Sequence, residues 1–378
     1  MKKRVFLIVL DSLGAGEAPD AKAFFDEGAH TLRTLYKTGT LKINTLKSLG
    51  IGNIDGLDFF GKNEKAIASV ARLRERSNGK DTIVGHWEIA GHISKNPLPT
   101  FPCGFPTSIL DKIEKISGRE LLCNKTYSGT KVIEDYGAEA LEKAALIVYT
   151  SADSVLQIAA HTSVVPLEEL YGICSTLRGE LVSAEESVGR IIARPFTTDS
   201  NGNFVRESNR KDFSLVPPKG LLPERVKESG FESIAIGKIN DIFSGVGFTQ
   251  TRITHSNEEG MAYLDEYVLE DFCGLCFANL VDFDMLWGHR RDAEAYANGL
   301  NVFDAWLSKF TKKLCEGDTV IIVADHGCDP GFDKSTDHTR EYVPYIEYSK
   351  NEPVKNYGTV DGFGFVADRI LTLLGIKR

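Results

Sequence analysis

The chain has 378 residues, of which 42% are hydrophobic and 26% are charged, a composition typical of a globular protein with a sizeable core. A formal net charge of −9 argues against a broad surface for nucleic acid or anionic membrane, but it is compatible with a local basic pocket for a phosphate. No apolar run is long enough to span a bilayer and the run at residues 5–10 is too short for a signal peptide, so we expect a cytoplasmic protein.

The first predicted strand covers residues 5–10 and ends at Asp11, where a loop with two glycines lets the backbone approach a ligand. Because the GxG of this loop lacks the third glycine and the later acidic partner of a dinucleotide-binding motif, the sequence does not favour nucleotide binding there. Residues 66–73 predict a second strand. The polar residues 79–88 are expected to form a loop that leads toward a helix.

Two proline-rich segments bracket the middle of the chain. Four prolines fall between residues 96 and 106, and three more fall between residues 217 and 223. Prolines interrupt regular structure and are typical of linkers. We therefore expect an inserted domain at residues 97–219, joined by two hinges to a core domain made of residues 1–96 and 220–378.

Within this insertion a new α/β pattern begins. Residues 146–149 predict a strand that ends near Asp153. Residues 185–194 predict a helix followed by a strand, and residues 196–212 form a polar stretch.

The core pattern resumes after the second proline-rich segment. Residues 233–237 predict a short strand and residues 273–281 predict a longer one. Between residues 296 and 314 the apolar residues alternate spacings of four and three, which indicates one face of an amphipathic helix packed on the sheet. Residues 363–374 predict a closing helix with Gly375 as its C-cap.

The stretch at residues 319–330 carries the clearest functional signal. Its apolar β-formers run directly into Asp325, His326 and Gly327, as expected of a buried parallel strand that delivers polar groups to its carboxyl end. Taken alone, this triplet fits a hydrogen-bonded turn as well as a metal site. Polar side chains elsewhere at strand ends and in a later loop favour metal, and together the set is Asp11, Asp284, His289, Asp325, His326 and His338.

Three carboxylates and three imidazoles without a thiolate form a ligand set suited to Mn²⁺, Zn²⁺ or Mg²⁺ and not to an iron–sulfur cluster. Divided between two ions, the set gives three ligands each and leaves coordination positions open. Two ions about 4 Å apart clamp the attacking and leaving oxygens of an in-line phosphoryl displacement. The ligand set therefore favours phosphoryl-transfer chemistry.

The sequence resembles phosphopentomutases, members of the alkaline phosphatase superfamily, over nearly its whole length. The segments that carry the resemblance are Asp11, Lys80-Asp-Thr-Ile-Val-Gly-His-Trp-Glu88, Asp284-x4-His289, Asp325-His326-Gly327 and Thr336-Asp-His-Thr-Arg340. The resemblance implies an α/β fold: a core with a mostly parallel sheet flanked by helices, plus an inserted smaller α/β cap domain.

The resemblance also implies roles for individual residues. One Mn²⁺ is expected on Asp284, His289 and His338, and a second on Asp11, Asp325 and His326, with Zn²⁺ and Mg²⁺ as alternatives. Thr82 is expected to carry the phosphoryl group, since metal coordination can activate a hydroxyl. Without the neighbouring motif, a threonine in a polar loop is more often a turn or cap residue. His86 and His92 match no metal position and are expected to support the structure around the site.

For the substrate, the resemblance implies that Asp153 contacts sugar hydroxyls and that Ile192 lines the pocket. Arg190, Arg206 and Lys238 are expected to face the distal phosphate, because guanidinium forks suit phosphate geometry. Isolated arginines are nevertheless most often surface residues, and Arg210 is a further candidate. One departure from the family pattern is Val84, where we expect a hydroxyl residue.

The expected function is that of an isomerase that interconverts α-D-ribose 1-phosphate, or 2-deoxyribose 1-phosphate, and the 5-phosphate in nucleoside catabolism. The implied route uses a phosphothreonine and a 1,5-bisphosphate, with a sugar bisphosphate as activator. The alternatives are a metal-dependent phosphatase or phosphodiesterase, a phosphoglycerate mutase of the same superfamily, and a non-catalytic metal-binding protein. We expect a monomer or weak oligomer whose partner is the small pentose phosphate, not nucleic acid or membrane.

The seven cysteines are scattered and odd in number, which does not indicate a disulfide framework. Cys273 and Cys276 form a CxxC inside an apolar strand-like run, where residues three apart point to opposite faces. We interpret them as core residues and not as a redox or zinc pair. Cys328, beside the candidate metal ligands, is a candidate for oxidation.

Overall fold

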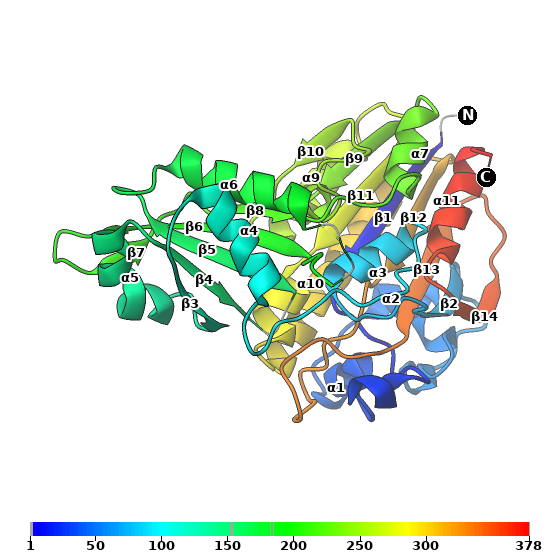
Figure 1. The fold of residues 1–378 in the computed structure, drawn as a ribbon. Coiled ribbons are helices and arrows are strands. Elements are labelled where there is room, and N and C mark those ends of the chain that lie inside the picture. The colour runs from blue at the N-terminus through cyan, green and yellow to red at the C-terminus, as the bar shows by residue number, and fades with distance from the viewer. Residues whose placement is uncertain (1–2, 152–153, 182, 184, 378) are drawn as a thin grey trace. The chain divides into compact units, whose positions relative to one another are not determined.

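The computed structural model describes residues 3–151, 154–181, 183 and 185–377. The chain divides into two compact units (Figure 1). The core unit consists of Met1–Lys95 and Pro217–Arg378, and the inserted unit consists of Asn96–Val216.

The core unit is built on an eight-stranded sheet in which only β13 runs antiparallel to its neighbours. The predicted strands at residues 5–10, 233–237 and 273–281 are confirmed as β1, β9 and β11. In sheet order the strands are β10 (Gln250–Arg252), β9 (Glu232–Ile236), β11 (Gly274–Leu280), β1 (Arg4–Leu10), β12 (Asp318–Val323), β13 (Val343–Ser349), β2 (Ser69–Arg74) and β14 (Asn356–Asp361).

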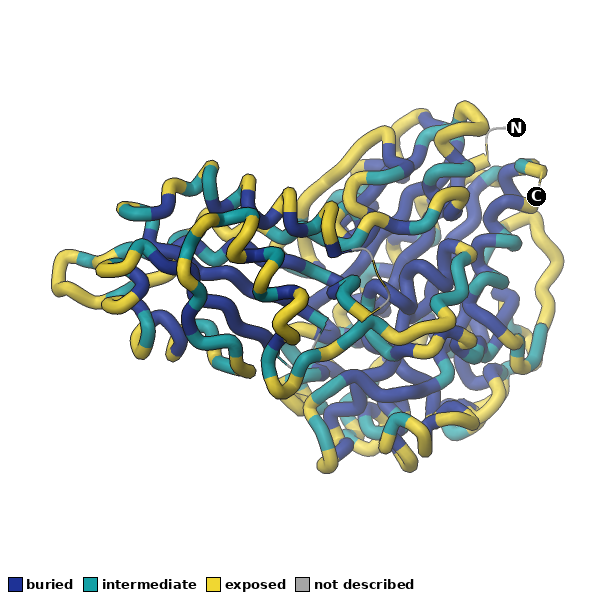
Figure 2. Tube along the Cα trace, in the orientation of Figure 1, coloured by how far each residue is buried: buried dark blue, intermediate teal, exposed yellow. Residues whose placement is uncertain are grey.

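The three central strands β11, β1 and β12 are buried along their whole length, and Figure 2 shows this centre in dark blue. Their continuous apolar sequences suit strands that are covered on both faces. In the register of the sheet, Leu10 pairs with Leu280 and Val9 pairs with Val323. The three strands therefore end side by side, and the residues that follow them start at one edge of the sheet.

Helices flank this sheet, which confirms the expected α/β fold with a mostly parallel sheet. The long helix predicted from its apolar spacing is α10, and its buried face includes Tyr296, Leu300 and Phe303. Helix α11 ends at Gly375 with φ 76°, as its predicted C-cap requires. None of the helices that the structure describes is long and apolar enough to cross a membrane. The helices of the core unit are α1 (Thr31–Lys37), α2 (Asn44–Leu49), α3 (Thr82–Ile89), α7 (Leu222–Glu228), α8 (Ile239–Ile242), α9 (Asn257–Tyr267), α10 (Ala293–Lys313) and α11 (Phe365–Leu374), with short 3-10 turns at Ala21–Phe24, Ile51–Asn53 and Asp58–Phe60.

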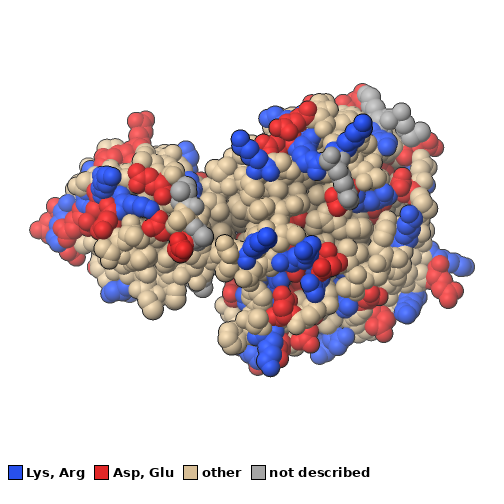
Figure 3. Space-filling view, turned by 45° about the vertical axis from the view of Figure 1, so that its right-hand side comes forward, with Lys and Arg blue, Asp and Glu red and all other residues tan. Residues whose placement is uncertain are grey.

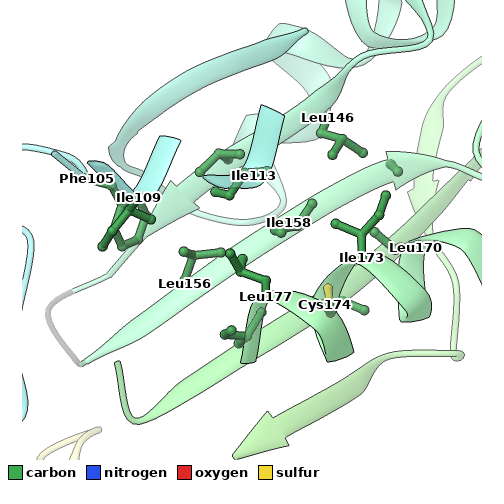
Figure 4. Close-up of a cluster of buried hydrophobic side chains, with 14 of the residues drawn as sticks. Phe105, Ile109, Ile113, Leu146, Leu156, Ile158, Leu170, Ile173, Cys174 and Leu177 are labelled. Atoms are coloured by element: carbon green, nitrogen blue, oxygen red, sulfur yellow. The ribbon is translucent and has the colours of Figure 1, made fainter. Parts of the chain in front are cut away.

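The inserted unit has its own mixed sheet and its own hydrophobic core. Helices α4 and α6 pack on strands β4, β5 and β6 through a cluster of buried side chains shown in Figure 4. The strands, in sheet order, are β3 (Leu121–Thr126), β4 (Leu146–Thr150), β5 (Val155–His161), β6 (Arg190–Thr198) and β7 (Phe204–Arg206), with β8 (Lys211–Ser214) also paired to β6; the helices are α4 (Thr107–Ser117), α5 (Lys131–Lys143) and α6 (Leu167–Glu180).

Three predictions from the sequence are wrong in detail. Residues 185–189 form a turn instead of a helix, and only the strand half of that prediction exists, as β6. No strand was predicted in the polar stretch at residues 196–212, but it contains the mostly exposed β7 and the start of the mostly half-buried β8. Cys276 is buried in β11 as expected, but Cys273 precedes the strand and is only partly buried.

Charged side chains of both signs are interspersed over the face of the molecule shown in Figure 3. Lysines and arginines lie next to aspartates and glutamates on each unit, and many form ion pairs, such as Lys313 with Asp265 and Lys143 with Glu139. Surface pairs of this kind contribute little to stability.

Candidate metal centre

Five of the six candidate ligands follow the ends of the three central strands, and His338 comes from the loop between β12 and β13. Asp11 comes directly after β1, and Asp325 and His326 come just after β12. Asp284 lies in a short π-helix, Phe283–Gly288, which begins soon after β11, and His289 follows this helix. Short π-helical segments occur frequently at functional sites.

One group consists of Asp284, His289 and His338, whose potential ligand atoms all lie within 4.8 Å of one another. The Nε2 atoms of His289 and His338 are 3.3 and 3.5 Å from the two carboxylate oxygens of Asp284. The same two nitrogens are only 3.1 Å from each other. This group corresponds to the first expected ligand set.

A second group consists of Asp11, Asp284 and His326, so Asp284 is common to both. The expected second set has Asp325 in place of Asp284. Asp325 also lies here, because its Oδ2 is 3.2 Å from Nε2 of His326, which is itself 3.4 Å from Oδ1 of Asp11. The structure thus brings all six residues together, while their division between two ions stays a prediction.

Hydrogen bonds to backbone carbonyls orient two of the imidazoles. Nδ1 of His289 lies 2.7 Å from the carbonyl oxygen of Thr336, and Nδ1 of His326 lies 3.1 Å from that of Gly327. A carbonyl only accepts hydrogen bonds, so each Nδ1 carries a proton and, in the neutral ring, the lone pair of Nε2 is free for a cation between the imidazole and the carboxylates. This is the usual arrangement of metal-bound histidine, in which the second ring nitrogen donates to a neighbouring group.

Three buried carboxylate oxygens at the centre have no hydrogen-bond partner among the described residues: Asp11 Oδ1, Asp284 Oδ1 and Asp325 Oδ2. Buried polar atoms are rarely left unpaired, and an ion is one way to satisfy them. Oxygen and imidazole donors that converge in this way fit Mn²⁺, Zn²⁺ or Mg²⁺. The residues present therefore fit a divalent metal centre.

The pKa shifts of the candidate ligands also favour a bound cation. Burial raises the pKa of Asp11 to about 7, and the charges of Asp325 and Asp284 add to this effect. Burial also opposes the charge of the His289 imidazolium, but the hydrogen bonds to Asp284 and Cys328 outweigh it and raise the pKa of His289 to about 12. Carboxylates packed this closely call for positive charge between them.

Thr82 is the first residue of helix α3, so the helix begins inside the segment that we expected to be a polar loop. The preceding Asp81 is the N-cap, because its side chain accepts hydrogen bonds from the backbone N–H groups of Ile83 and Val84 at 3.0 and 3.1 Å. The hydroxyl of Thr82 lies 3.2 Å from Nε2 of His326. An alcohol therefore stands within hydrogen-bonding distance of one of the six candidate ligands.

Gly85 allows α3 to pack directly against the backbone that carries Asp325. A Cβ atom at this position would lie 2.2 Å from the carbonyl oxygen of Asp325, so no other residue fits without a shift of the helix. At the end of the same helix, the buried carboxylate of Glu88 accepts hydrogen bonds from the backbone N–H groups of Arg76, Ser77 and Phe363. Gly85 and Glu88 of the Gly-His-Trp-Glu segment thus fix the position of α3 in the core unit.

The Thr336–Arg340 segment is tied to the core by buried charge. The guanidinium of Arg340 is buried and pairs with Glu75 and Asp20, while Lys80 reaches Asp26 at 2.9 Å and Asp337 at 3.5 Å. These contacts fix the loop that supplies His338.

The sequence reasoning missed two residues that shape the site. Asn279 in β11 donates a hydrogen bond from Nδ2 to Oδ2 of Asp11 at 2.9 Å. Its signal was a single amide inside an otherwise apolar strand. Glu341 is buried and accepts hydrogen bonds from the backbone of Gly16 and Thr31, which fixes the loop after β1. Nothing in its local sequence indicated this role.

The expected substrate residues are distributed over both units. Lys238 follows β9 in the core unit, and its positive charge acts to lower the pKa of Asp11. In the inserted unit, Arg190 lies 3.7 Å from Asp212, and Nε of Arg206 donates to the carbonyl oxygen of Gly129 at 3.2 Å.

The other residues singled out from the sequence differ in their surroundings. Ile192 is buried in β6, Arg210 makes two hydrogen bonds to the carboxylate of Asp212, and Asp153 lies outside the described residues. Cys328 is buried in the core unit, with Sγ 4.0 Å from Nδ1 of His289.

Comparison with known proteins gives matches over the full chain. A sequence model of the Metalloenzyme superfamily matches residues 3–378. The chain is 49% identical over 377 residues to a phosphopentomutase of Lachnoclostridium phytofermentans, with 99% of this chain and 96% of that protein covered. It is 47% identical over 380 residues to a phosphopentomutase of Clostridium novyi, with 100% of this chain and 96% of that protein covered. Among solved structures, a protein from Pyrococcus horikoshii has a TM-score of 0.51 at 11% identity, with 100% of this chain and 98% of that chain covered, which is a likeness of fold.

Proposed function

We propose that this chain interconverts α-D-ribose 1-phosphate, or 2-deoxyribose 1-phosphate, and the corresponding 5-phosphate. The chain belongs to the phosphopentomutase family and is accordingly an isomerase. The observation that carries this proposal is the hydroxyl of Thr82, 3.2 Å from His326 at the edge of the six candidate ligands. An alcohol in this position can accept and return a phosphoryl group when a metal activates its oxygen.

In the proposed cycle, Thr82 starts as a phosphothreonine. The bond from its oxygen to phosphorus breaks as a hydroxyl oxygen of the bound monophosphate forms a new bond to the same phosphorus, which gives a 1,5-bisphosphate. The bisphosphate then reorients, and the Thr82 oxygen accepts its other phosphoryl group. The hydroxyl of the product is released, phosphothreonine is regenerated, and a sugar bisphosphate can supply the first phosphoryl group.

The candidate ligands have a defined part in this proposal. Asp284, His289 and His338 would hold one Mn²⁺, and Asp11, Asp325 and His326 would hold the second. When bound, the pair of ions offsets negative charge on the transferred phosphoryl group and its entering and leaving oxygens. The carbonyl partners of His289 and His326 keep the Nε2 lone pairs directed into the site.

Recognition of the sugar phosphate is assigned to the residues that the family resemblance implies. Arg190, Arg206 and Lys238 bind the distal phosphate, Asp153 binds sugar hydroxyls, and Ile192 lines the pocket. The inserted unit serves as the cap, because a mutase must exclude water while the phosphoryl group is in transit, or the group is lost to hydrolysis.

The proposal is tested by following α-D-ribose 1-phosphate with Mn²⁺ and a catalytic amount of α-D-ribose 1,5-bisphosphate. We expect ribose 5-phosphate to appear much faster than inorganic phosphate. Release of inorganic phosphate faster than isomer formation would mean that the protein is a phosphatase. Activity on 2- or 3-phosphoglycerate without activity on pentose phosphates would mean that the substrate assignment is wrong.

A further inference from the structure

His86 lies on α3 four residues beyond Thr82, and its ring is completely buried. Its Nδ1 is 2.8 Å from the carbonyl oxygen of Thr82 and 3.1 Å from Oδ2 of Asp325. On the other side of the ring, Nε2 is 3.0 Å from Nδ2 of Asn279. One imidazole therefore contacts the helix start that bears the alcohol, a candidate metal ligand and a residue of the central strand β11.

The donors and acceptors around this ring are determined by its neighbours. Nδ2 of Asn279 points at Oδ2 of Asp11, 2.9 Å away, and only the NH₂ end of the amide can face a carboxylate favourably. The second hydrogen of that NH₂ group is then available to Nε2 of His86, which must accept it with a lone pair. The single proton of a neutral ring is consequently on Nδ1, where both neighbours, the Thr82 carbonyl and the Asp325 carboxylate, are acceptors.

This arrangement leaves His86 unsuited to the two usual roles of an active-site histidine. Its Nε2 lone pair is occupied by Asn279, so it is not available to a metal ion. Its Nδ1 carries the proton and donates it to the carbonyl oxygen of Thr82, so this nitrogen has no lone pair with which to act as a general base. What the ring does is connect groups that belong to different strands and a helix.

We infer that His86 and Asn279 form a positioning bridge, in which the Nδ1–H side of His86 sets the helix start that carries Thr82 and the Nε2 side, through Asn279, sets the carboxylate of Asp11. The half of this inference that concerns phosphoryl transfer rests on the proposed function of Thr82. The half that concerns Asp11 is independent of it, because it predicts an effect on metal binding alone.

Two substitutions of His86 separate the two sides of the bridge. The amide oxygen of His86→Gln can replace Nε2 as acceptor for Asn279, while the donor to Thr82 is lost. The amide of His86→Asn can replace the Nδ1 donor, while Asn279 loses its acceptor. Asn279→Leu removes the link to Asp11 directly. His92→Asn is the matched control, because His92 lies just beyond the same helix and its ring packs on Trp87 away from the bridge.

Two quantities are measured on the full-length protein: Mn²⁺ affinity by calorimetry, and the rate of phosphoryl uptake at Thr82 from α-D-ribose 1,5-bisphosphate by mass spectrometry at saturating Mn²⁺. We expect His86→Gln to slow phosphoryl uptake by about 10- to 100-fold at nearly unchanged Mn²⁺ affinity. His86→Asn and Asn279→Leu should instead lower Mn²⁺ affinity by about 10- to 100-fold, the range found for groups that orient metal ligands. His92→Asn should change neither.

The inference is overturned if the two His86 variants lose both properties in equal proportion with a lowered unfolding temperature, since that pattern indicates general support of the fold. It is also overturned if both variants behave as His92→Asn does. If wild-type protein takes up no phosphoryl group but the Mn²⁺ effects appear, the proposed function fails while the bridge to Asp11 stands.

A measurement on the wild-type protein tests the bridge even if the variants do not fold. Ring nitrogen NMR of ¹⁵N-histidine-labelled protein with Mg²⁺ should show a His86 ring protonated at Nδ1 and bare at Nε2, with the signal assigned from its stacking contact with Phe277. The opposite tautomer would contradict the bridge.

Discussion

The candidate residues of the core unit and those of the inserted unit are held in different ways. In the core unit the potential metal ligands are almost all buried, they follow neighbouring strands, and they face one another at 3.1 to 3.5 Å. In the inserted unit Arg190 and Arg206 are at least partly exposed and contact groups of their own unit, Asp212 and the carbonyl of Gly129. The first arrangement is organised before any ligand binds, whereas the second must exchange existing contacts for a phosphate.

The largest effect is expected at Thr82, whose hydroxyl lies 3.2 Å from the candidate ligand His326. Thr82→Ala should lower mutase activity on the order of a thousandfold or more, because the variant lacks the hydroxyl that we propose carries the phosphoryl group. Mn²⁺ binding should persist. Thr107→Ala is a matched control, since Thr107 also opens a helix, α4, but in the inserted unit. Activity of Thr82→Ala comparable to that of Thr107→Ala would rule out the phosphothreonine.

A smaller but still large effect is expected at Asp284, the ligand shared by both groups. Asp284→Asn should weaken Mn²⁺ binding by about 100-fold or more, because one buried charge opposite two imidazoles is lost. Calorimetric titration should show the site of Asp284, His289 and His338 weakened more than the site of Asp11, Asp325 and His326, whereas Asp265→Asn, a carboxylate paired with Lys313, should leave both unchanged. Equal weakening of the two sites would show that Asp284 is shared between the ions.

The difference in packing between the core unit and the inserted unit can be tested by replacing one glycine in each unit with alanine. Gly85→Ala should lower the free energy of unfolding by about 1–3 kcal/mol, because its Cβ would lie 2.2 Å from the carbonyl oxygen of Asp325. Gly172 lies inside α6 of the inserted unit, and a Cβ added there would meet no atom within 4 Å, so Gly172→Ala should be neutral or slightly stabilising. Denaturant unfolding of the two variants measures the difference, and equal stability would mean that α3 can move away from Asp325 at no cost.

The smallest effect is expected in the inserted unit. Arg190→Ala should raise KM for ribose 5-phosphate by about tenfold, because it removes one charge-assisted hydrogen bond to the phosphate. Mn²⁺ affinity should be unchanged. Lys143→Ala removes an exposed cation of the same unit that pairs with Glu120 and Glu139, and it should have no effect. If the two variants have the same KM, Arg190 does not bind the phosphate.

The difference between the long apolar strands of the core unit and the short strands of the inserted unit explains how much could be predicted from the sequence. Strands β1, β11 and β12 were recognisable because they are continuous apolar runs, and the polar residues after them indicated the metal centre. Strands β7 and β8 were missed because strands of three or four residues are too short to show apolar alternation. The start of α3 was misjudged although Asp81 is a typical N-cap residue.

The bridge through His86 could not be predicted from sequence spacing. Asn279 is 193 positions from His86 and 268 positions from Asp11, so no local pattern joins them. Which nitrogen of His86 carries the proton depends on the orientation of that distant amide. Only the folded sheet brings these groups within hydrogen-bonding distance.

The alcohol at the start of α3 is central to the proposed function, because it is the group that carries the phosphoryl. Its most direct test is the intact mass of the purified protein with Mn²⁺ before and after incubation with α-D-ribose 1,5-bisphosphate, followed by peptide mapping. We expect one added phosphoryl group per chain, located on Thr82. No added mass, or a phosphoryl group on another residue, would contradict the assignment of Thr82.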